Sequence, residues 1–243
     1  MIVLNERKYA ENIIETDAFK SKPYYDLQIL ARYLYHVEGY RKKRIEKYLL
    51  DFIDKHFPPY KANRRTWEDN IERISSKAGK YELVEIDSIS ITESELQRIS
   101  EINSKRHRRV IFTMLCLAKL ADMKNKKNNG WCNNELKEIF KLARVSATII
   151  QQDFIIGDLG LLGLLEFPKM NGNLSSRVTF IDNNSEIVLR INESDFQELG
   201  YVYLQYCGEN IIHCQNCGTL IKGNKNGTKK YCSDCAGYKC SET

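Results

Sequence analysis

The sequence predicts a mostly α-helical α+β protein with small β elements, and three observations support this prediction. Apolar residues recur at helical spacing through most of the first two thirds of the chain. Short apolar stretches separated by turn residues follow Gly163. Two Cys-x-x-Cys pairs then lie near the end. We therefore expect an N-terminal helical region (1–104), a middle domain (105–192) and a helix followed by a cysteine module (193–243).

The composition permits a sizeable core and excludes wholesale disorder. Of the 243 residues, 42% are hydrophobic and 28% are charged. The formal net charge of +5 permits a polyanionic partner without demanding one. No apolar run has the length of a signal-peptide core or of a membrane helix, so we expect a cytoplasmic protein that does not enter membranes.

Helical patterns dominate the N-terminal region. Leu27, Leu30 and Leu34 recur at helical spacing. Thr92 and Glu95 have the spacing of a capping box. The expected elements are two helices within 23–57, a third helix over 67–74, a strand over 81–91 and a helix over 92–104. Acidic residues dominate 82–101, and the basic run 105–109 follows, which places a boundary near residue 105.

The middle domain alternates helical and strand-like patterns. Helices are expected over 110–123, over 135–144 with Asn133 or Asn134 as the cap, and over 147–162 with Ser146 as the cap. Strand-like segments are expected over 164–167, 177–181 and 186–191, with turns at 170–173 and 182–185. Three helices with a tight turn between the last two, followed by a hairpin, is the order of elements that the winged helix-turn-helix shows, and the domain resembles that fold.

This resemblance implies a way of binding duplex DNA. The third helix would enter the major groove, where glutamine can bond an adenine edge, and the hairpin would contact the backbone. The polar candidates on that helix are Thr148, Gln151 and Gln152. The candidates for phosphate contacts are Arg144, Lys169 and Arg177.

The third helix departs from the pattern of a DNA-reading helix. Residues 146–167 contain no Lys or Arg but do contain Asp153, Asp158 and Glu166. Its apolar residues are expected to be core by their spacing: Ile149, Ile150, Phe154, Ile155 and Leu159. A winged helix can instead dock a protein, and this interpretation stays open beside the DNA-binding one.

A helix expected over 192–207, with Asn192 or Ser194 as its cap, leads to the cysteine module. Cys214 and Cys217 form one Cys-x-x-Cys pair, and Cys232 and Cys235 form the other. With the adjoining Gly218 and the segment KYCSDCA, the module resembles treble-clef and zinc-ribbon modules. Four thiolates around one ion favour a structural Zn²⁺, and the alternatives are an iron–sulfur centre, a redox dithiol or two incidental cysteine turns. His213 and Cys240 are spare ligand candidates.

The loop between the two pairs carries four lysines and no acid: Lys222, Lys225, Lys229 and Lys230. They can balance the charge of the thiolates or bind phosphates. Further basic runs lie at 41–44, 105–109 and 124–127, and Tyr40, Trp131 and Tyr231 near basic residues are candidates for base stacking.

The sequence lacks phosphate-binding, dinucleotide-binding and nucleophile-elbow motifs, so we expect no enzyme. The predicted function is that of a non-enzymatic DNA-binding protein, either a transcription regulator or a replication-initiation accessory factor. The alternative is an adaptor or inhibitor that binds a protein of the transcription or replication machinery. An exposed apolar patch on the N-terminal helices would favour a protein partner or a homodimer.

Overall fold

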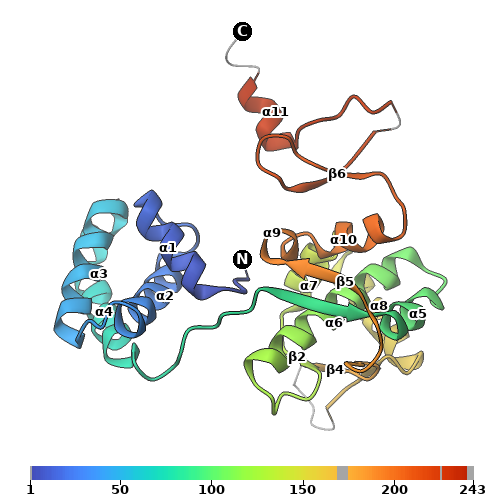
Figure 1. Ribbon diagram of the computed structural model, residues 1–243, viewed down its shortest axis with the longest axis horizontal. Coiled ribbons are helices and arrows are strands. Elements are labelled where there is room, and N and C mark those ends of the chain that lie inside the picture. The colour runs from blue at the N-terminus through green and yellow to red at the C-terminus, as the bar shows by residue number, and fades with distance from the viewer. Residues whose placement is uncertain (1, 169–174, 225, 240–243) are drawn as a thin grey trace. The chain divides into compact units, whose positions relative to one another are not determined.

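The structure is a computed structural model that describes residues 2–168, 175–224 and 226–239 (Figure 1). The chain forms two compact units, Met1–Asp87 and Ser88–Thr243. Helices predominate and the sheets are small and antiparallel, which confirms the predicted α+β class. In the described part of the chain, no helix combines the length and the apolar character that a bilayer crossing requires.

The first unit is a cluster of helices. Its elements are α1 (Glu6–Thr16), α2 (Pro23–His36), α3 (Lys42–His56), the 3-10 helix η1 (Pro58–Asn63) and α4 (Arg64–Lys77). Sequence analysis missed α1, although Asn5 supplies a cap signal and its Oδ1 accepts a hydrogen bond from Lys8 N at 3.0 Å. Pro58 follows the end of α3, as expected from the missing N–H of proline.

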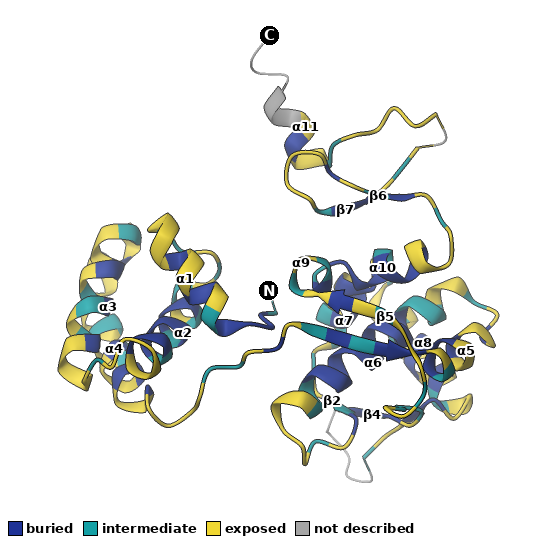
Figure 2. Ribbon diagram, viewed as in Figure 1, coloured by how far each residue is buried: buried dark blue, intermediate teal, exposed yellow. Residues whose placement is uncertain are grey.

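The core of the first unit lies between these helices, whose buried residues are dark blue in Figure 2. Ile13, Leu30 and Leu49 come from three different helices and are almost completely buried. Tyr9 Oη donates to the buried Asp26 carboxylate at 2.8 Å, and the backbone N–H groups of Lys20 and Ser21 donate to the same carboxylate. This network fixes the α1–α2 connection, because a buried carboxylate needs all of its partners.

The second unit begins with a strand. Its first elements are β1 (Ser88–Thr92), α5 (Glu93–Ser100), α6 (Lys105–Lys124), β2 (Trp131–Cys132), α7 (Leu136–Leu142), α8 (Ile149–Leu161) and β3 (Leu165–Glu166). They are followed by β4 (Ser176–Val178), β5 (Ile187–Asn192), α9 (Glu193–Phe196), α10 (Leu199–Tyr206), β6 (Ile211–His213), β7 (Leu220–Lys222) and α11 (Ser233–Lys239).

Pairing between β1 and β5 explains where the two units divide. These strands are antiparallel, with Ile89 opposite Ile191 and Ile91 opposite Leu189. Because β1 pairs with β5, it belongs to the second unit, and the division falls at residue 87 and not near 105. The observed strand β1 therefore lies at the C-terminal end of the segment predicted as a strand over 81–91.

Helices α6 and α8 pack with a three-stranded antiparallel sheet of order β2-β4-β3, and α7 packs on α6. Gly163 has a φ of +71°, a backbone conformation that favours glycine, and it turns the chain from α8 into β3. The strand predicted over 177–181 corresponds to β4, which begins at Ser176 and ends at Val178, so only its first two predicted residues are in this sheet. The segment predicted over 186–191 is β5, which pairs with β1 instead.

Several helix boundaries differ from the predicted ones. Helix α6 begins at Lys105, where Ser104 caps it, because the basic run is itself helical. Neither Asn133 nor Asn134 caps α7, and Asn134 bonds the Glu138 carboxylate instead. The cap of α8 is Thr148 and not Ser146, because Thr148 and Gln151 form a capping box. The helix predicted over 192–207 is divided into α9 and α10.

Candidate metal centre

The first cysteine pair lies on a turn that the β6–β7 hairpin positions. His213 pairs with Leu220, so the chain must reverse between Cys214 and Thr219. Within the turn, Gly218 N donates to Cys214 O at 2.9 Å, and Cys214 N donates to Thr219 O at 2.9 Å. Gly218 adopts a φ of +74° with open space around it, so the left-handed backbone conformation explains the glycine.

The second cysteine pair lies at the start of α11. Cys232 directly precedes this helix and Cys235 lies in its first turn. Gln215 N donates to Lys230 O at 3.0 Å, which joins the turn to the segment that precedes the helix. Cys232 N donates to Cys214 Sγ at 3.3 Å. The two pairs therefore face each other across a short distance.

The geometry of the four cysteines fits one tetrahedral metal ion. All four Sγ atoms lie within 4.8 Å of one another, and those of Cys217 and Cys232 are 3.7 Å apart. Tetrahedral zinc with Zn–S bonds of about 2.3 Å places its sulfur ligands about 3.8 Å apart. Cys214, Cys217, Cys232 and Cys235 can therefore hold a metal ion such as zinc.

The electrostatics of the cluster also favour a cation. Backbone N–H groups, that of Cys217 first, lower the pKa of the Cys214 thiol to about 6. The Thr219 hydroxyl, 3.3 Å from Cys217 Sγ, lowers the pKa of Cys217. The Asn216 amide acts to lower the pKa of Cys235, but the neighbouring sulfur atoms together raise it to about 12. The lowered pKa of Cys214 and Cys217 favours their thiolate forms, which are the forms that bind a metal ion.

Sequence reasoning missed one contributor to this cluster. Asn216 Nδ2 donates to Cys235 Sγ at 3.3 Å, so one of the two residues between the first two cysteines also bonds the second pair. Its position inside the Cys-x-x-Cys turn is the signal that identifies it. Of the spare ligands, His213 uses Nδ1 to bond Gly218 O at 3.0 Å, and Cys240 lies outside the described residues.

A groove of about 780 Å³ lies beside the cysteine cluster within the second unit. Arg144, Lys222 and Lys229 line it, so the fold brings together three cations that the sequence suggested separately. Tyr201 and Tyr231 also line it, together with Asp234. Tyr201 could not be predicted, because nothing in its local sequence indicates that α10 passes this groove.

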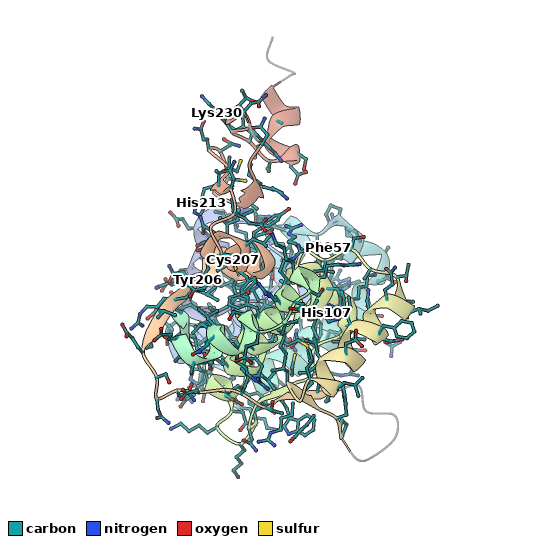
Figure 3. All side chains as sticks on the ribbon, turned by 90° about the vertical axis from the view of Figure 1, so that its right-hand side faces the viewer. Phe57, His107, Tyr206, Cys207, His213 and Lys230 are labelled. Carbon is teal, nitrogen blue, oxygen red and sulfur yellow. The ribbon has the colours of Figure 1, made fainter. Side chains whose placement is uncertain are left out.

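The charge of Arg144 is already partly offset. Its guanidinium forms a two-pronged ion pair with Glu198, whose carboxylate is almost fully buried, and stands 5.5 Å above the Tyr201 ring. Lys222 and Lys229 have exposed side chains. The two lysines are consequently the stronger anion-binding groups of the groove. Lys230 lies on the same module, as Figure 3 shows, but outside the groove lining, and Lys225 lies outside the described residues.

The polar candidates at the start of α8 bond within the chain. Gln151 Oε1 accepts from Thr148 N at 3.1 Å, and Thr148 Oγ1 accepts from Gln151 N at 3.4 Å. Gln152 Nε2 donates to Ala147 O at 3.1 Å. These three side chains therefore stabilise the first turn of α8, and contact with a base would require them to leave these bonds.

Internal partners also occupy much of the remaining basic surface. Arg177 lies on β4 and bonds Glu166 at 2.9 Å, while Lys169 lies outside the described residues. In the run 105–109, Lys105 pairs with Glu209 at 2.9 Å, and Arg106, Arg108 and Arg109 donate to backbone carbonyl groups. This run thus ties α6 to neighbouring segments of the second unit.

No family model, curated protein or solved structure matches this chain.

Proposed function

We propose that this chain is a non-enzymatic, cytoplasmic DNA-binding protein that regulates transcription or assists the initiation of replication. The groove beside the four cysteines carries the proposal. It combines Lys222 and Lys229 with the aromatic rings of Tyr201 and Tyr231. The two lysines are exposed and suit phosphates, while the two tyrosines are half-buried and offer the edge of an aromatic surface for sugar or base contacts.

A structural Zn²⁺ would give this groove its shape. The segment after α10 has little core of its own, since Ile211, Leu220 and Ile221 are its buried aliphatic residues in the described part of the chain. Figure 2 shows this segment as mostly exposed. A closed four-thiolate site leaves no position for water or substrate, so the ion would stabilise the fold and take no part in chemistry. The arrangement of a cysteine turn on a hairpin with two ligands at a helix start supports a treble-clef interpretation.

The remainder of the second unit supports the interpretation as a winged helix-turn-helix. The order α6-β2-α7-α8-β3-β4 and the sheet order β2-β4-β3 agree with three helices followed by a hairpin. Helix α8 contains no Lys or Arg, so it would contact DNA less strongly than the groove beside the cysteines. We therefore assign phosphate binding to the zinc module and its groove.

Removing the two groove lysines should weaken binding to duplex DNA. We expect Lys222→Gln/Lys229→Gln to lower the affinity and to flatten its dependence on salt. The slope of log K against log salt is negative, and its magnitude should decrease by about 0.9 for each phosphate that the protein no longer neutralises. The measurement is a titration of a mixed-sequence duplex at several salt concentrations, with the protein loaded with zinc.

The matched control is Lys137→Gln/Lys141→Gln on α7, which removes the same charge from exposed positions outside the groove. This control should keep the wild-type slope. If the groove variant also keeps it, the lysines only balance the thiolates and the DNA proposal is wrong.

The exposed face of α8 favours a second function, that of an adaptor. The spacing predicted that Ile149, Ile150 and Phe154 are core residues, but this prediction is wrong. They are 76%, 68% and 68% exposed, respectively. Leu161 on the same helix is 89% exposed, while Ile155 and Leu159 are buried as predicted. An apolar stripe of this kind, on a helix whose charged residues are acidic, suits contact with a protein better than contact with DNA.

A pair of adjacent substitutions tests whether this face is free. We expect Phe154→Ala to change the free energy of unfolding by less than about 0.5 kcal/mol, because an exposed ring packs against little of the chain. Ile155→Ala should lower it by about 2–5 kcal/mol through the cavity it leaves. Urea unfolding at two protein concentrations measures both. A large destabilisation by Phe154→Ala that depends on protein concentration would mean that a second copy of the chain covers the stripe.

A further inference from the structure

A pocket in the first unit has a chemistry that the proposed function does not use. Helices α2 and α4 enclose about 380 Å³, which lies within the usual range of small-molecule sites, about 300–1,000 Å³. Helix α2 contributes Tyr24, Gln28 and Arg32, which lie four residues apart and so share one face. The α4 side contributes Arg73, Ile74, Lys77, Ala78 and Tyr81.

The pocket has an apolar base and aromatic walls. Ile74 and Ala78 line it with side chains that are 5% and 1% exposed, so they are packed into the core of the unit. Tyr24 and Tyr81 also line it but are 41% and 57% exposed. Two accessible rings beside an apolar base provide surfaces on which a flat ring can stack.

The charge of the pocket is positive. None of the residues that line it in the described chain is acidic, and three of them are cations. Arg32 donates to the buried Glu6 carboxylate at 2.8 Å, which holds it in place and offsets its charge. Arg73 and Lys77 form no ion pair with a described carboxylate, whereas Arg32 and other cations of the first unit do.

Arg73 and Lys77 are also one helical turn apart on α4. Like charges at this spacing repel each other on a helix surface. An anion bound between them would remove the repulsion, and a phosphate group can accept hydrogen bonds from both side chains. A simple inorganic anion would account for the two cations but would leave the exposed tyrosines without a role.

We propose that this pocket binds a nucleotide, with its phosphate held by Arg73 and Lys77 and its base against Tyr24 or Tyr81. The same chemistry is present in a free nucleoside phosphate and in one nucleotide of a single strand. The residues that line this pocket all belong to the first unit and those that line the groove beside the cysteines to the second, so the proposal does not rest on the groove.

The test is a calorimetric titration of the full chain with inorganic phosphate, with AMP and with an oligothymidylate of eight nucleotides. Wild-type protein should bind AMP more tightly than phosphate. Arg73→Ala/Lys77→Ala should weaken AMP binding at least about tenfold, since each charge-assisted bond that is removed contributes to affinity. Tyr24→Ala/Tyr81→Ala should keep phosphate binding and lose the additional affinity for AMP.

The same titration includes a control variant and distinguishes a free nucleotide from one nucleotide of a single strand. Lys61→Ala/Arg65→Ala removes exposed cations outside the pocket and should bind AMP as wild type does. Displacement of AMP by the oligothymidylate would identify a strand as the source of the nucleotide, and failure to displace it would identify a free nucleotide. Equal affinity for AMP and phosphate, or unchanged AMP binding by Arg73→Ala/Lys77→Ala, would overturn the proposal.

Discussion

Cys214→Ser and Cys232→Ser are each expected to abolish stoichiometric zinc binding and to unfold the C-terminal module, while the helices before it remain folded. Each substitution removes one of four sulfur ligands whose atoms lie within 4.8 Å of one another. The oxygen of serine is a poor replacement for a thiolate at such a site. The metal content of the purified variants and the cleavage of the segment after α10 by a protease measure the two effects.

The effect is large because the module depends on the ion. Structural zinc contributes an apparent free energy of about 10–16 kcal/mol in zinc-finger peptides. Burial of Ile211, Leu220 and Ile221 supplies roughly 2–3 kcal/mol each at most, and the cost in conformational entropy of ordering the loop between the cysteine pairs opposes it. Without the metal, this segment therefore has too little buried apolar surface to stay folded.

Cys207→Ser provides the matched control. Cys207 is an exposed cysteine just beyond the end of α10 and is not part of the cluster. This variant should bind zinc like the wild type and resist the protease equally. One full equivalent of zinc in both Cys214→Ser and Cys232→Ser would remove these residues from the ligand set. Iron in place of zinc would keep the ligands and change the identity of the metal.

Local signals in the sequence predicted most of the candidate metal site. The first Cys-x-x-Cys pair with Gly218 forms a tight turn and the second pair lies at a helix start, and the geometry of both depends on a few neighbouring residues. The Thr92–Glu95 capping box was predicted for the same reason, and the structure contains it. Such features need no knowledge of the rest of the fold.

Features that depend on distant segments were not predictable from one sequence. The pairing of β1 with β5 joins residues about a hundred positions apart. It determines which part of the segment predicted over 81–91 forms the strand. The groove likewise combines Arg144, Tyr201 and Lys222, which come from three separated segments. A strand pattern indicates that a partner exists but does not identify it.

The buried face of α8 was predicted incorrectly because apolar residues occur on every side of this helix, interspersed with a few polar ones. Periodicity indicates the buried face only when one side is polar. Phe154 and Ile155 are adjacent and both apolar, yet one is exposed and the other is buried. Only the packing of α8 in the folded unit distinguishes them.

The second large effect is a loss of stability when a buried ion pair is broken. Glu95 of the capping box forms this pair with Lys119, which the sequence did not indicate. Glu95 is fully buried, and its carboxylate accepts from Lys119 Nζ at 2.7 and 2.9 Å. It also accepts from Thr92 N and from Asp182 N, both at 2.9 Å. One carboxylate thus joins α5, the middle of α6 and the loop before β5.

Glu95→Ala should therefore lower the free energy of unfolding of the second unit by about 3–5 kcal/mol, because it leaves the Lys119 ammonium buried without a partner. The matched control is Glu101→Ala, which removes an exposed ion pair with Arg98 and should cost less than about 1 kcal/mol. The chain has two tryptophans, one in each unit, so a Trp67→Phe background leaves Trp131 to report on the second unit during urea unfolding.

The double variant Glu95→Gln/Lys119→Met separates the cost of the orphaned charge from that of the missing hydrogen bonds. Replacing Lys119 removes the ammonium, and glutamine keeps an oxygen for Thr92 N or Asp182 N. We expect the double variant to recover most of the stability that Glu95→Ala loses, since a buried pair contributes less net free energy than the penalty for breaking it. If the double variant is as unstable as Glu95→Ala, the backbone hydrogen bonds to the carboxylate, and not the charge of Lys119, account for the role of Glu95 in holding α5, α6 and β5 together.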